Sequence, residues 1–541
     1  MPLLPVILWT DALIYLLVAV VAGFVWYVRR HEHLRAPWWR VAQTPAAMSA
    51  LVVLALFIGV GLLDSVHFRL ALPAAQAVQA GKAASRDVAY AVEVKSALDV
   101  VLASIANRPE RTYSAPLATH AYARETLELP GADGKPGKQL RTYPRLTYGG
   151  AHLRDPERDW KADVLLTGFR GVALALPLWL LLSLALVAAC NSPERLASRD
   201  FWHAVWRGRT AVPWRAILIT LALLLLLAVP MILLSLDYHV LGTDKVGLDV
   251  LYLSLKSVRT ALVIGTLTTL VMLPFSVLLG IMAGYLRGVV DDLIQYFYTT
   301  LNSIPGVLLI AAAVLVLQVY IETHPDLFPT SAQRADFRLL WLCIILGITS
   351  WTGLCRLLRG EALKLRELEY VQAAQAFGVS EWRIMMRHIL PNLMHIVLIS
   401  VVMDFSGLVL AEAVLSYVGV GVDPSMISFG TMINAARLEM GREPMVWWSL
   451  ASAFAFMLAL VLAANLFADA VRDAFDPRVR VGNGGRRLAE VESCARCCRS
   501  RISRPGWTVR AVRCAPSTAS ASKWRAARPT PSSANRAAEN P

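Results

Sequence analysis

The sequence predicts an all-α polytopic membrane protein that carries one exported α/β insertion. Of its 541 residues, 56% are hydrophobic and 17% are charged, and the mean hydropathy is +0.51. That composition is typical of membrane proteins. Several apolar runs also approach the length of about 20 residues that a helix needs to cross a bilayer. These runs cover residues 5–27, 45–64, 167–190, 216–236, 258–285, 294–320, 338–356, 393–421 and 447–470.

Basic residues predict the orientation of these runs, because arginine and lysine resist translocation. Arginines cluster at 29–40 and at 191–215, and the segment 356–391 is also basic. We expect all three segments in the cytoplasm. Alternating spans then place the N-terminus and residues 65–166 outside the cell and the C-terminus inside. The first run lacks a preceding basic residue and a clear cleavage site, so we expect it to stay as an anchor in the inner membrane.

The expected domains follow in chain order. Residues 1–64 hold two spans, 65–166 form the exported domain, and 167–213 supply a third span and a cytoplasmic linker. Residues 214–480 hold the other six spans. Within the exported domain, 139–143 looks strand-like and 84–106 looks helical, which makes it α/β. None of the seven cysteines falls in 65–166, so we expect no disulfide there.

The last segment, 481–541, is predicted to be a disordered basic cytoplasmic tail. It is rich in arginine, serine, alanine and proline and lacks apolar periodicity. Its four cysteines suggest zinc as an alternative, but no partner histidine follows them, and we expect no metal site. We also expect no nucleic-acid partner, because such a partner needs a folded basic surface. The four cysteines are Cys494, Cys497, Cys498 and Cys514.

A charged loop at 361–391 lies between two apolar runs. Residues 361–375 are rich in helix formers, Gly378 can adopt the positive φ that ends a helix, and Pro391 is expected to close a second short helix. Small side chains at the tip allow another backbone to approach closely, while Arg366, Arg383 and Arg387 can pair with acidic groups. The loop is therefore predicted to be a helix-turn-helix that docks a partner protein.

Four motifs occur in a fixed order. The first combines Gln372-Ala373-Ala374, Gly378 and His388-Ile389-Leu390-Pro391. The other three are His239-Val-Leu-Gly-Thr-Asp-Lys-Val-Gly-Leu-Asp-Val-Leu251, Glu412-Ala-Val-Leu-Ser-Tyr-Val-Gly-Val-Gly421 and Asp469-Ala-Val-Arg-Asp-Ala-Phe-Asp-Pro-Arg478. Over about 200–480 the chain resembles the inner-membrane permease subunits of ABC importers, in the second-permease branch for dipeptides, oligopeptides and nickel. It departs from the family pattern at Gln372, His388 and Leu248, where Glu, Ile and Arg are usual.

The resemblance implies a six-helix, type I, MetI-like transmembrane core in 214–480, preceded by about three extra helices. It implies import of peptides by alternating access, together with a second homologous permease, two ABC ATPase subunits, an extracytoplasmic peptide-binding protein and the lipid bilayer. ATP and Mg would be used by the ATPases, with no cofactor bound by this chain. The ATPase-coupling residues would be Glu361, Gln372, Ala373, Ala374, Gly378, Arg383 and Pro391. The extracytoplasmic gate motif would comprise Gly242, Thr243, Asp244, Gly247 and Asp249.

Asp404 and Glu412 are charges inside a predicted span. An ionised group there costs about 2.5 to 3.5 kcal/mol on insertion scales and usually faces a cavity or a partner. Their spacing of eight residues, about 2.2 turns, favours one helical face. They would either line the translocation pathway or, for Glu412, brace neighbouring helices. Pro305 is predicted to bend the sixth span, for alternating access or as a static packing kink.

Catalytic functions find no support in the sequence. It contains no Gly-rich phosphate loop that ends in Gly-Lys-Ser or Gly-Lys-Thr, and no Gly-x-Ser-x-Gly elbow. We therefore expect no catalytic residues and no enzyme activity. Three alternatives to the peptide importer remain: a nickel-chelate permease, a membrane sensor or assembly protein that uses the exported domain, and an ion-coupled transporter. The sensor would not need the paired Leu-Gly-Thr-Asp and Asp-Pro-Arg motifs. The ion-coupled transporter predicts more coupling charges in the membrane and no docking loop.

Overall fold

The structure is a computed structural model, and it describes residues 3–71, 90–91, 93–128, 139–190, 199–328 and 330–475. The predicted basic tail and its four cysteines lie outside the described residues. So do the first residues of the predicted helix at 84–106. The following description concerns the compact unit Met1–Asp476.

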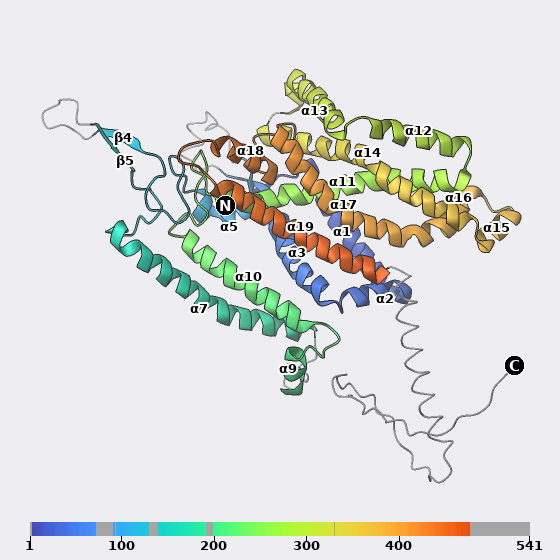
Figure 1. Ribbon diagram of the computed structural model, residues 1–541, viewed down its shortest axis with the longest axis horizontal. Helices are drawn as coiled ribbons and strands as arrows, with labels where there is room; N and C mark the ends of the chain where they lie inside the picture. The colour runs from blue at the N-terminus through green and yellow to red at the C-terminus, as the bar shows by residue number, and fades with distance from the viewer. Residues whose placement is uncertain are drawn as a thin grey trace, which may run out of the picture. The chain divides into compact units, whose positions relative to one another are not determined.

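The described elements are mostly helices (Figure 1). The N-terminal part comprises β1 (Leu3–Pro5), α1 (Trp9–Arg30), α2 (Glu32–Val41) and α3 (Pro45–Asp64). The insertion that follows comprises β2 (His67–Leu70), β3 (Lys95–Ser96), α5 (Ala97–Val101), α6 (Ala103–Ala106), β4 (Glu125–Glu128) and β5 (Gln139–Thr142). Then come α7 (Pro156–Cys190), α9 (Arg199–Trp206), α10 (Trp214–Ser235), α11 (Val250–Leu286), α12 (Val289–Ser303) and α13 (Gly306–Thr323). The chain ends with the 3₁₀ helix η2 (Pro325–Leu327), α14 (Ser331–Arg366), α15 (Glu369–Ala376), α16 (Glu381–Ile384), the π-helix η3 (Met385–Ile389), α17 (Leu390–Val418), α18 (Phe429–Glu439) and α19 (Trp448–Phe475).

Nine helical segments within the described ranges are long and apolar enough to cross a membrane, as the sequence predicts. Several extend beyond their predicted ends. With 37 residues, α11 is about 55 Å long, well over the 30 Å of a hydrocarbon core. A helix of this length exceeds the hydrocarbon core even when it is moderately tilted.

The predicted sixth span at 294–320 is two helices rather than one bent helix. Helix α12 stops at Ser303, Ile304 is extended, and α13 begins after Pro305. Proline disfavours helical geometry in the residue before it, which explains the break at Ile304. The spanning segment is therefore α13 alone, and Pro305 lies exposed at the junction.

Pro391 begins a helix instead of closing one. The helical segment from Glu381 continues through the π-helical turn into α17, with Pro391 in the first turn of α17. Pro391 follows the π-helical turn Met385–Ile389, and such turns occur where the regular i→i−4 hydrogen bonding of a helix is interrupted, as it is by a proline. The prediction of a helix stop at Pro391 was wrong for that reason.

The insertion contains two small β-sheets and two short helices. Strands β1, β2 and β3 form an antiparallel sheet, while β4 and β5 form a hairpin in the register Glu125↔Thr142. Helix within the predicted 84–106 segment is limited to α5 and α6 among the described residues. Ser96 caps α5 with a capping box, which sets its start after β3.

Helices α11 and α14 form the central pair of the core. They approach closely at Gly280 and Gly284, where a Cβ would lie 2.9 Å and 2.6 Å from α14 backbone oxygens. Small residues spaced by four allow such contact between membrane helices. Helix α1 is joined to this pair by the ion pair of Asp11 with Arg259, 2.6 Å long, and by Thr10, whose N–H donates to Asp336 at 3.2 Å.

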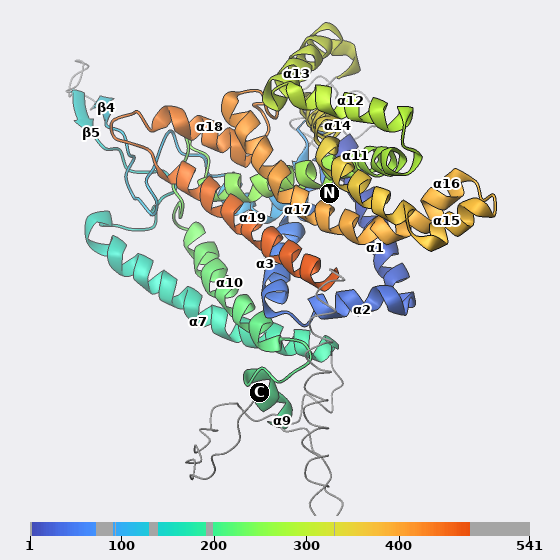
Figure 2. The same cartoon turned by 45° about the vertical axis from the view of Figure 1, so that its right-hand side comes forward.

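Helix α3, from the predicted N-terminal region, packs directly on α11 and α19. Helix α10 instead packs on α7 and α3, and the two views agree that α7 and α10 run side by side (Figures 1 and 2). This packing differs from the predicted grouping, in which α10 opens the transport core and α3 belongs to a separate N-terminal region.

Candidate functional site

The segment 361–391 forms a compact loop at one end of α14 and α17. Helix α14 ends at Arg366, α15 follows, and Gly378 turns the chain with φ of +74° before α16. A positive φ is costly for most residues with a Cβ, so the turn favours glycine at this position. Val371, Ile384 and Ile389 are fully buried against α11 and α14. The loop is thus a packed extension of the core.

Polar contacts also tie this loop to the end of α11. Gln375 donates from Nε2 to the hydroxyl of Tyr285 at 2.9 Å, and Arg287 pairs with Glu367 at 2.5 Å. One step further, Arg359 of α14 holds Asp291 of α12 with two hydrogen bonds of 2.5 and 2.6 Å. These contacts connect the loop to α11, and α14 to α12.

The predicted coupling residues do not share one location. Gln372, Ala373, Gly378 and Arg383 are exposed on α15, the turn and α16, so the structure brings them together. Ala374 is half-buried and packs against the core, and exposed Pro391 lies at the start of α17. Glu361 lies near the end of α14, where it pairs with Lys364 at 2.7 Å. The four exposed residues on α15, the turn and α16 form the outer surface of the loop. Ala374, Pro391 and Glu361 lie at the base of the loop.

Exposed apolar side chains on the same surface were missed by the sequence analysis. Phe377, next to the turn glycine, is 87% exposed, and Trp382 is 55% exposed. Leu368 and Tyr370 are also exposed. Exposed aromatic residues that gather on one surface mark interaction sites. The signal in the sequence was an apolar residue on each side of a turn glycine in an otherwise charged loop.

A second turn, the predicted gate motif at 242–249, precedes α11. Asp244 forms it by accepting hydrogen bonds at Oδ1 from the N–H groups of Val246 and Leu248, at 3.0 and 2.8 Å. Asp249 then caps α11 by accepting the N–H of Leu251 at 2.8 Å. Leu248, at the position where arginine is usual, packs into an apolar cluster with its side chain half-buried.

Two glycines of this motif allow the insertion to lie directly on it. Gly242 and Gly247 have φ of +74° and +80°. A Cβ on Gly247 would lie 1.9 Å from the carbonyl oxygen of Glu110, and one on Gly242 would lie 2.5 Å from that of Ser114. Backbone hydrogen bonds join the same segments, from Glu110 to Gly247 at 3.0 Å and from Thr243 to Ser114 at 3.1 Å. Both glycines serve this close approach.

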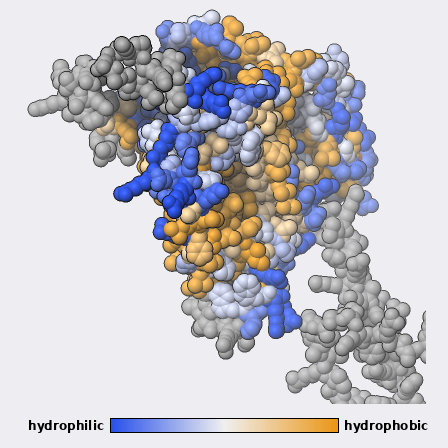
Figure 3. Space-filling view, turned by 60° about the vertical axis from the view of Figure 1, so that its left-hand side comes forward, coloured by the Kyte–Doolittle hydropathy of each residue, from blue (hydrophilic) through white to orange (hydrophobic). Residues whose placement is uncertain are grey.

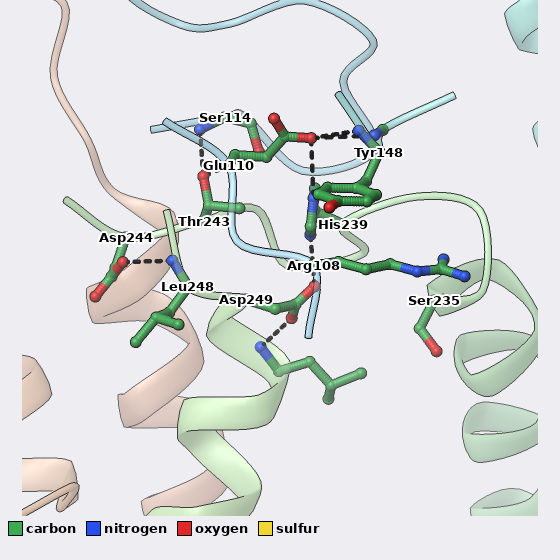
Figure 4. A network of polar contacts seen from close by, with 12 residues as sticks. Arg108, Glu110, Ser114, Tyr148, Ser235, His239, Thr243, Asp244, Leu248 and Asp249 are labelled. Atoms are coloured by element: carbon green, nitrogen blue, oxygen red, sulfur yellow. Dashed lines mark hydrogen bonds and ion pairs between the residues drawn. The ribbon is translucent and has the colours of Figure 1, made fainter. Parts of the chain in front are cut away.

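Side chains complete what we call the outer clamp, the contact of Glu110 and Ser114 with His239, Thr243 and Asp249 (Figure 4). Ser114 donates its N–H to Thr243 Oγ1 at 2.6 Å. His239 Nδ1 lies 2.8 Å from Asp249 Oδ2, and its Nε2 lies 3.6 Å from Glu110 Oε1, an ion-pair distance. The insertion is thereby fastened to the start of α11.

In the outer clamp, His239 and Glu110 each stabilise the charged form of the other. Burial alone would lower the pKa of His239, but its contacts with Asp249 and Glu110 outweigh burial and raise that pKa to about 9. Burial likewise favours the neutral form of Glu110, but His239 and the N–H groups of Thr147, Tyr148 and Gly149 lower its pKa to about 2. At neutral pH the pair is therefore an imidazolium and a carboxylate.

The candidate pathway residues lie in three different environments. Glu412 is fully buried and accepts hydrogen bonds at Oε1 from Ser416 and Ser428, at 2.7 and 3.0 Å. These bonds join α17 to the start of α18, the bracing arrangement considered for this residue. Asp404 is half-buried, and among the described residues it has no hydrogen-bond or ion-pair partner. Pro305 is exposed at the junction of α12 and α13.

No group of three or more histidine, cysteine, aspartate or glutamate residues suited to hold a metal occurs in the ranges that the structure describes. Cys343 and Cys355 are buried free thiols in α14. Their surroundings are the apolar side chains of the core, so they act there as small packed residues.

Comparison with known proteins relates this chain to transport permeases. The sequence model of the family described as binding-protein-dependent transport system inner membrane component matches residues 276–481. A glutathione transport system permease protein from Pectobacterium atrosepticum is 31% identical over 242 residues, 45% of this chain and 73% of the relative. An oligopeptide transport system permease protein from Haemophilus influenzae is 28% identical over 243 residues, 45% of this chain and 71% of the relative.

A dipeptide transport system permease protein from Lactococcus lactis is 29% identical over 242 residues. That match covers 45% of this chain and 64% of the relative, so the chain spans just under two thirds of its length.

Proposed function

Because the chain belongs to the family of binding-protein-dependent transport system inner membrane components, we propose that it is the permease subunit of an ATP-driven importer of peptides. The observation that carries this proposal is the packed loop at 361–391 with its exposed aromatic tip, in a chain of this family. The relatives are permeases named for dipeptides, oligopeptides and glutathione, all of which are peptides. Peptides are therefore favoured over nickel chelates.

The proposed assembly contains this chain, a second homologous permease, two ABC ATPase subunits and an extracytoplasmic peptide-binding protein. ATP and Mg would be bound by the ATPases. The tip of the loop, formed by Gln372, Ala373, Phe377, Gly378 and Arg383, would contact one ATPase. An aromatic anchor surrounded by polar groups is the usual composition of such an interface.

The proposed orientation places this tip in the cytoplasm of a cell with an inner membrane. The insertion and the outer clamp would then lie outside the membrane, and the C-terminus inside. The arginines at 29–40 and 191–215 support this orientation through the preference of basic loops for the cytoplasm.

The mechanism would be alternating access driven from the loop. Closure of the ATPases would move α15 and α16, and the buried contacts of Val371 and Ile384 would transmit that movement to α11 and α14. The Arg287 and Asp291 contacts would carry it on to α12 and the exposed break at Pro305. A packed loop can act this way because close-packed interiors transmit displacement.

The first test replaces Gly378 with aspartate. A Cβ at Gly378 meets nothing within 4 Å, and aspartate tolerates a positive φ better than most residues, so the fold should survive. The charge should abolish uptake of radiolabelled peptide and the co-purification of ATPase subunits, with normal membrane insertion. Phe377→Ala should weaken both by removing the exposed anchor.

Gly208→Asp is the matched control, since Gly208 also has a positive φ, of +67°, and open space around its Cβ. It should leave uptake unchanged. A Gly378→Asp chain that imports peptide at the normal rate would contradict the assignment of the loop, and a folded wild-type chain that never recovers an ATPase would contradict the importer itself.

A further inference from the structure

A cavity of about 330 Å³ lies at the seam between the insertion and the loop that joins α18 to α19. One side comes from residues 113–124 and from 141–143 of the insertion, and the other from residues 442–446. We call it the seam cavity. It exists only because the insertion lies on the core. Figure 3, which turns this end of the molecule forward, shows hydrophilic residues gathered over the insertion and apolar residues on the helices beyond it.

Guanidinium groups dominate the charge around the seam cavity. Arg124 and Arg141 come from the insertion, Arg442 comes from the core loop, and Glu443 is the acidic residue in the lining. Arg442 pairs with Glu439 at the long distance of 3.4 Å. Neither Arg124 nor Arg141 has a carboxylate partner within the part of the chain that the structure describes. Among the described residues, these two guanidinium groups are available to an anion.

Tyrosine rings form the walls between these charges. Tyr122 is held in place by donating its hydroxyl to the carbonyl oxygen of Met445 at 3.0 Å and by an edge contact with Trp448, with the ring centres 4.8 Å apart. The guanidinium of Arg442 lies 5.4 Å from the ring centre of buried Tyr113, and that of Arg124 lies 5.2 Å from the ring centre of Tyr143. Such cation–π contacts orient the guanidinium groups without neutralising them.

We infer that the seam cavity binds the carboxyl-terminal end of a short peptide. The planar fork of a guanidinium matches the two oxygens of a carboxylate. The tyrosine walls suit an apolar or aromatic final side chain, and Glu443 suits the ammonium group of a dipeptide. A volume of about 330 Å³ lies at the small end of the range for ligand sites, which fits one or two residues. A protein partner would instead need a broad surface of about 800 Å² on each side.

The inference rests on the proposed function only for the ligand class, which is peptides. Its test uses the purified full chain in lipid nanodiscs, without ATPases or a binding protein. Isothermal titration compares alanyl-phenylalanine with its carboxyl-terminal amide. The amide should bind at least about tenfold more weakly, because it lacks the charge that the arginines recognise.

The double variant Arg124→Gln with Arg141→Gln should lower the affinity for alanyl-phenylalanine by about tenfold or more. Both side chains are exposed, so the fold should not depend on them. Arg154→Gln, at an exposed position of the same insertion outside the lining, should bind as the wild type does.

Three results would overturn the inference: equal binding of acid and amide, full affinity in the double variant, or no binding by the wild type at millimolar peptide. The proposed function fails separately. If the chain recruits ATPases but does not bind alanyl-phenylalanine, only the inference about the seam cavity is contradicted. If the chain binds the peptide but never recruits ATPases, only the importer proposal is contradicted.

Discussion

His239 is the residue that ties the insertion to the transport core. Its imidazole lies between Asp249, which caps α11, and Glu110 of the insertion, and only about 4% of the residue is exposed. Of these three, His239 and Asp249 both belong to the motif 239–251 that the sequence analysis identified. Glu110 could not be found the same way, because 139 positions separate it from Asp249 and no spacing rule joins them.

The outer clamp should make stability depend on pH. The pKa of His239 rises from 6.5 to about 9 on folding, so its contribution is complete below about pH 6.5 and is lost as the pH rises through 9. Glu110, whose pKa falls from 4.5 to about 2, contributes fully above pH 4.5. The His239 contribution is on the order of 3 kcal/mol, at about 1.4 kcal/mol for each unit of pKa.

Thermal unfolding of the purified chain in detergent between pH 5.5 and 9.5 measures this. The midpoint temperature of unfolding should stay constant up to about pH 6.5 and then decrease. His239→Gln should lower the midpoint at pH 6.5 and remove most of the decline. A wild-type midpoint that rises from pH 7 to 9 would contradict the charge assignment.

At the scale of secondary-structure elements, the positions of most helices could be predicted from the sequence, but which helices pack against each other could not. Apolar runs and turn residues predict where α1, α3 and α10 occur, since these features are local. Which of them packs on α11 depends on the matching of side chains between segments far apart in sequence. Ala47 of α3 is fully buried against Val471 and Ala474 of α19, whereas α10 packs on α7 and α3. We therefore expect α3 to behave as a helix of the core.

Ala47→Leu tests that expectation. The larger side chain would overpack the contact between α3 and α19, which typically costs about 1–3 kcal/mol. Ala55→Leu is the matched control, because Ala55 is exposed on the same helix. The thermal midpoint should fall for Ala47→Leu and stay within error for Ala55→Leu. Equal midpoints for the two variants would show that α3 is not tightly packed on α19.

At the scale of the whole chain, the two candidate sites lie at opposite ends of the long helices. The outer clamp and the seam cavity adjoin the start of α11, and the loop at 361–391 packs on its end (Figure 1). In the chain, 242–249 precedes α11, and the loop at 361–391 begins in the last turns of α14. The seam cavity escaped prediction because its lining joins residues about 300 positions apart.

This separation makes the orientation of the chain measurable with two single cysteines in a background that lacks the seven natural ones. Arg154→Cys lies on the insertion and Phe377→Cys on the tip of the loop, and both positions are exposed. Because the basic segments at 29–40 and 191–215 favour the cytoplasm, a membrane-impermeant maleimide should label Cys at 154 in intact spheroplasts. It should label Cys at 377 only in inverted vesicles. The reverse pattern would place the loop outside, where no ATP-driven partner could reach it, and the coupling role would have to be abandoned.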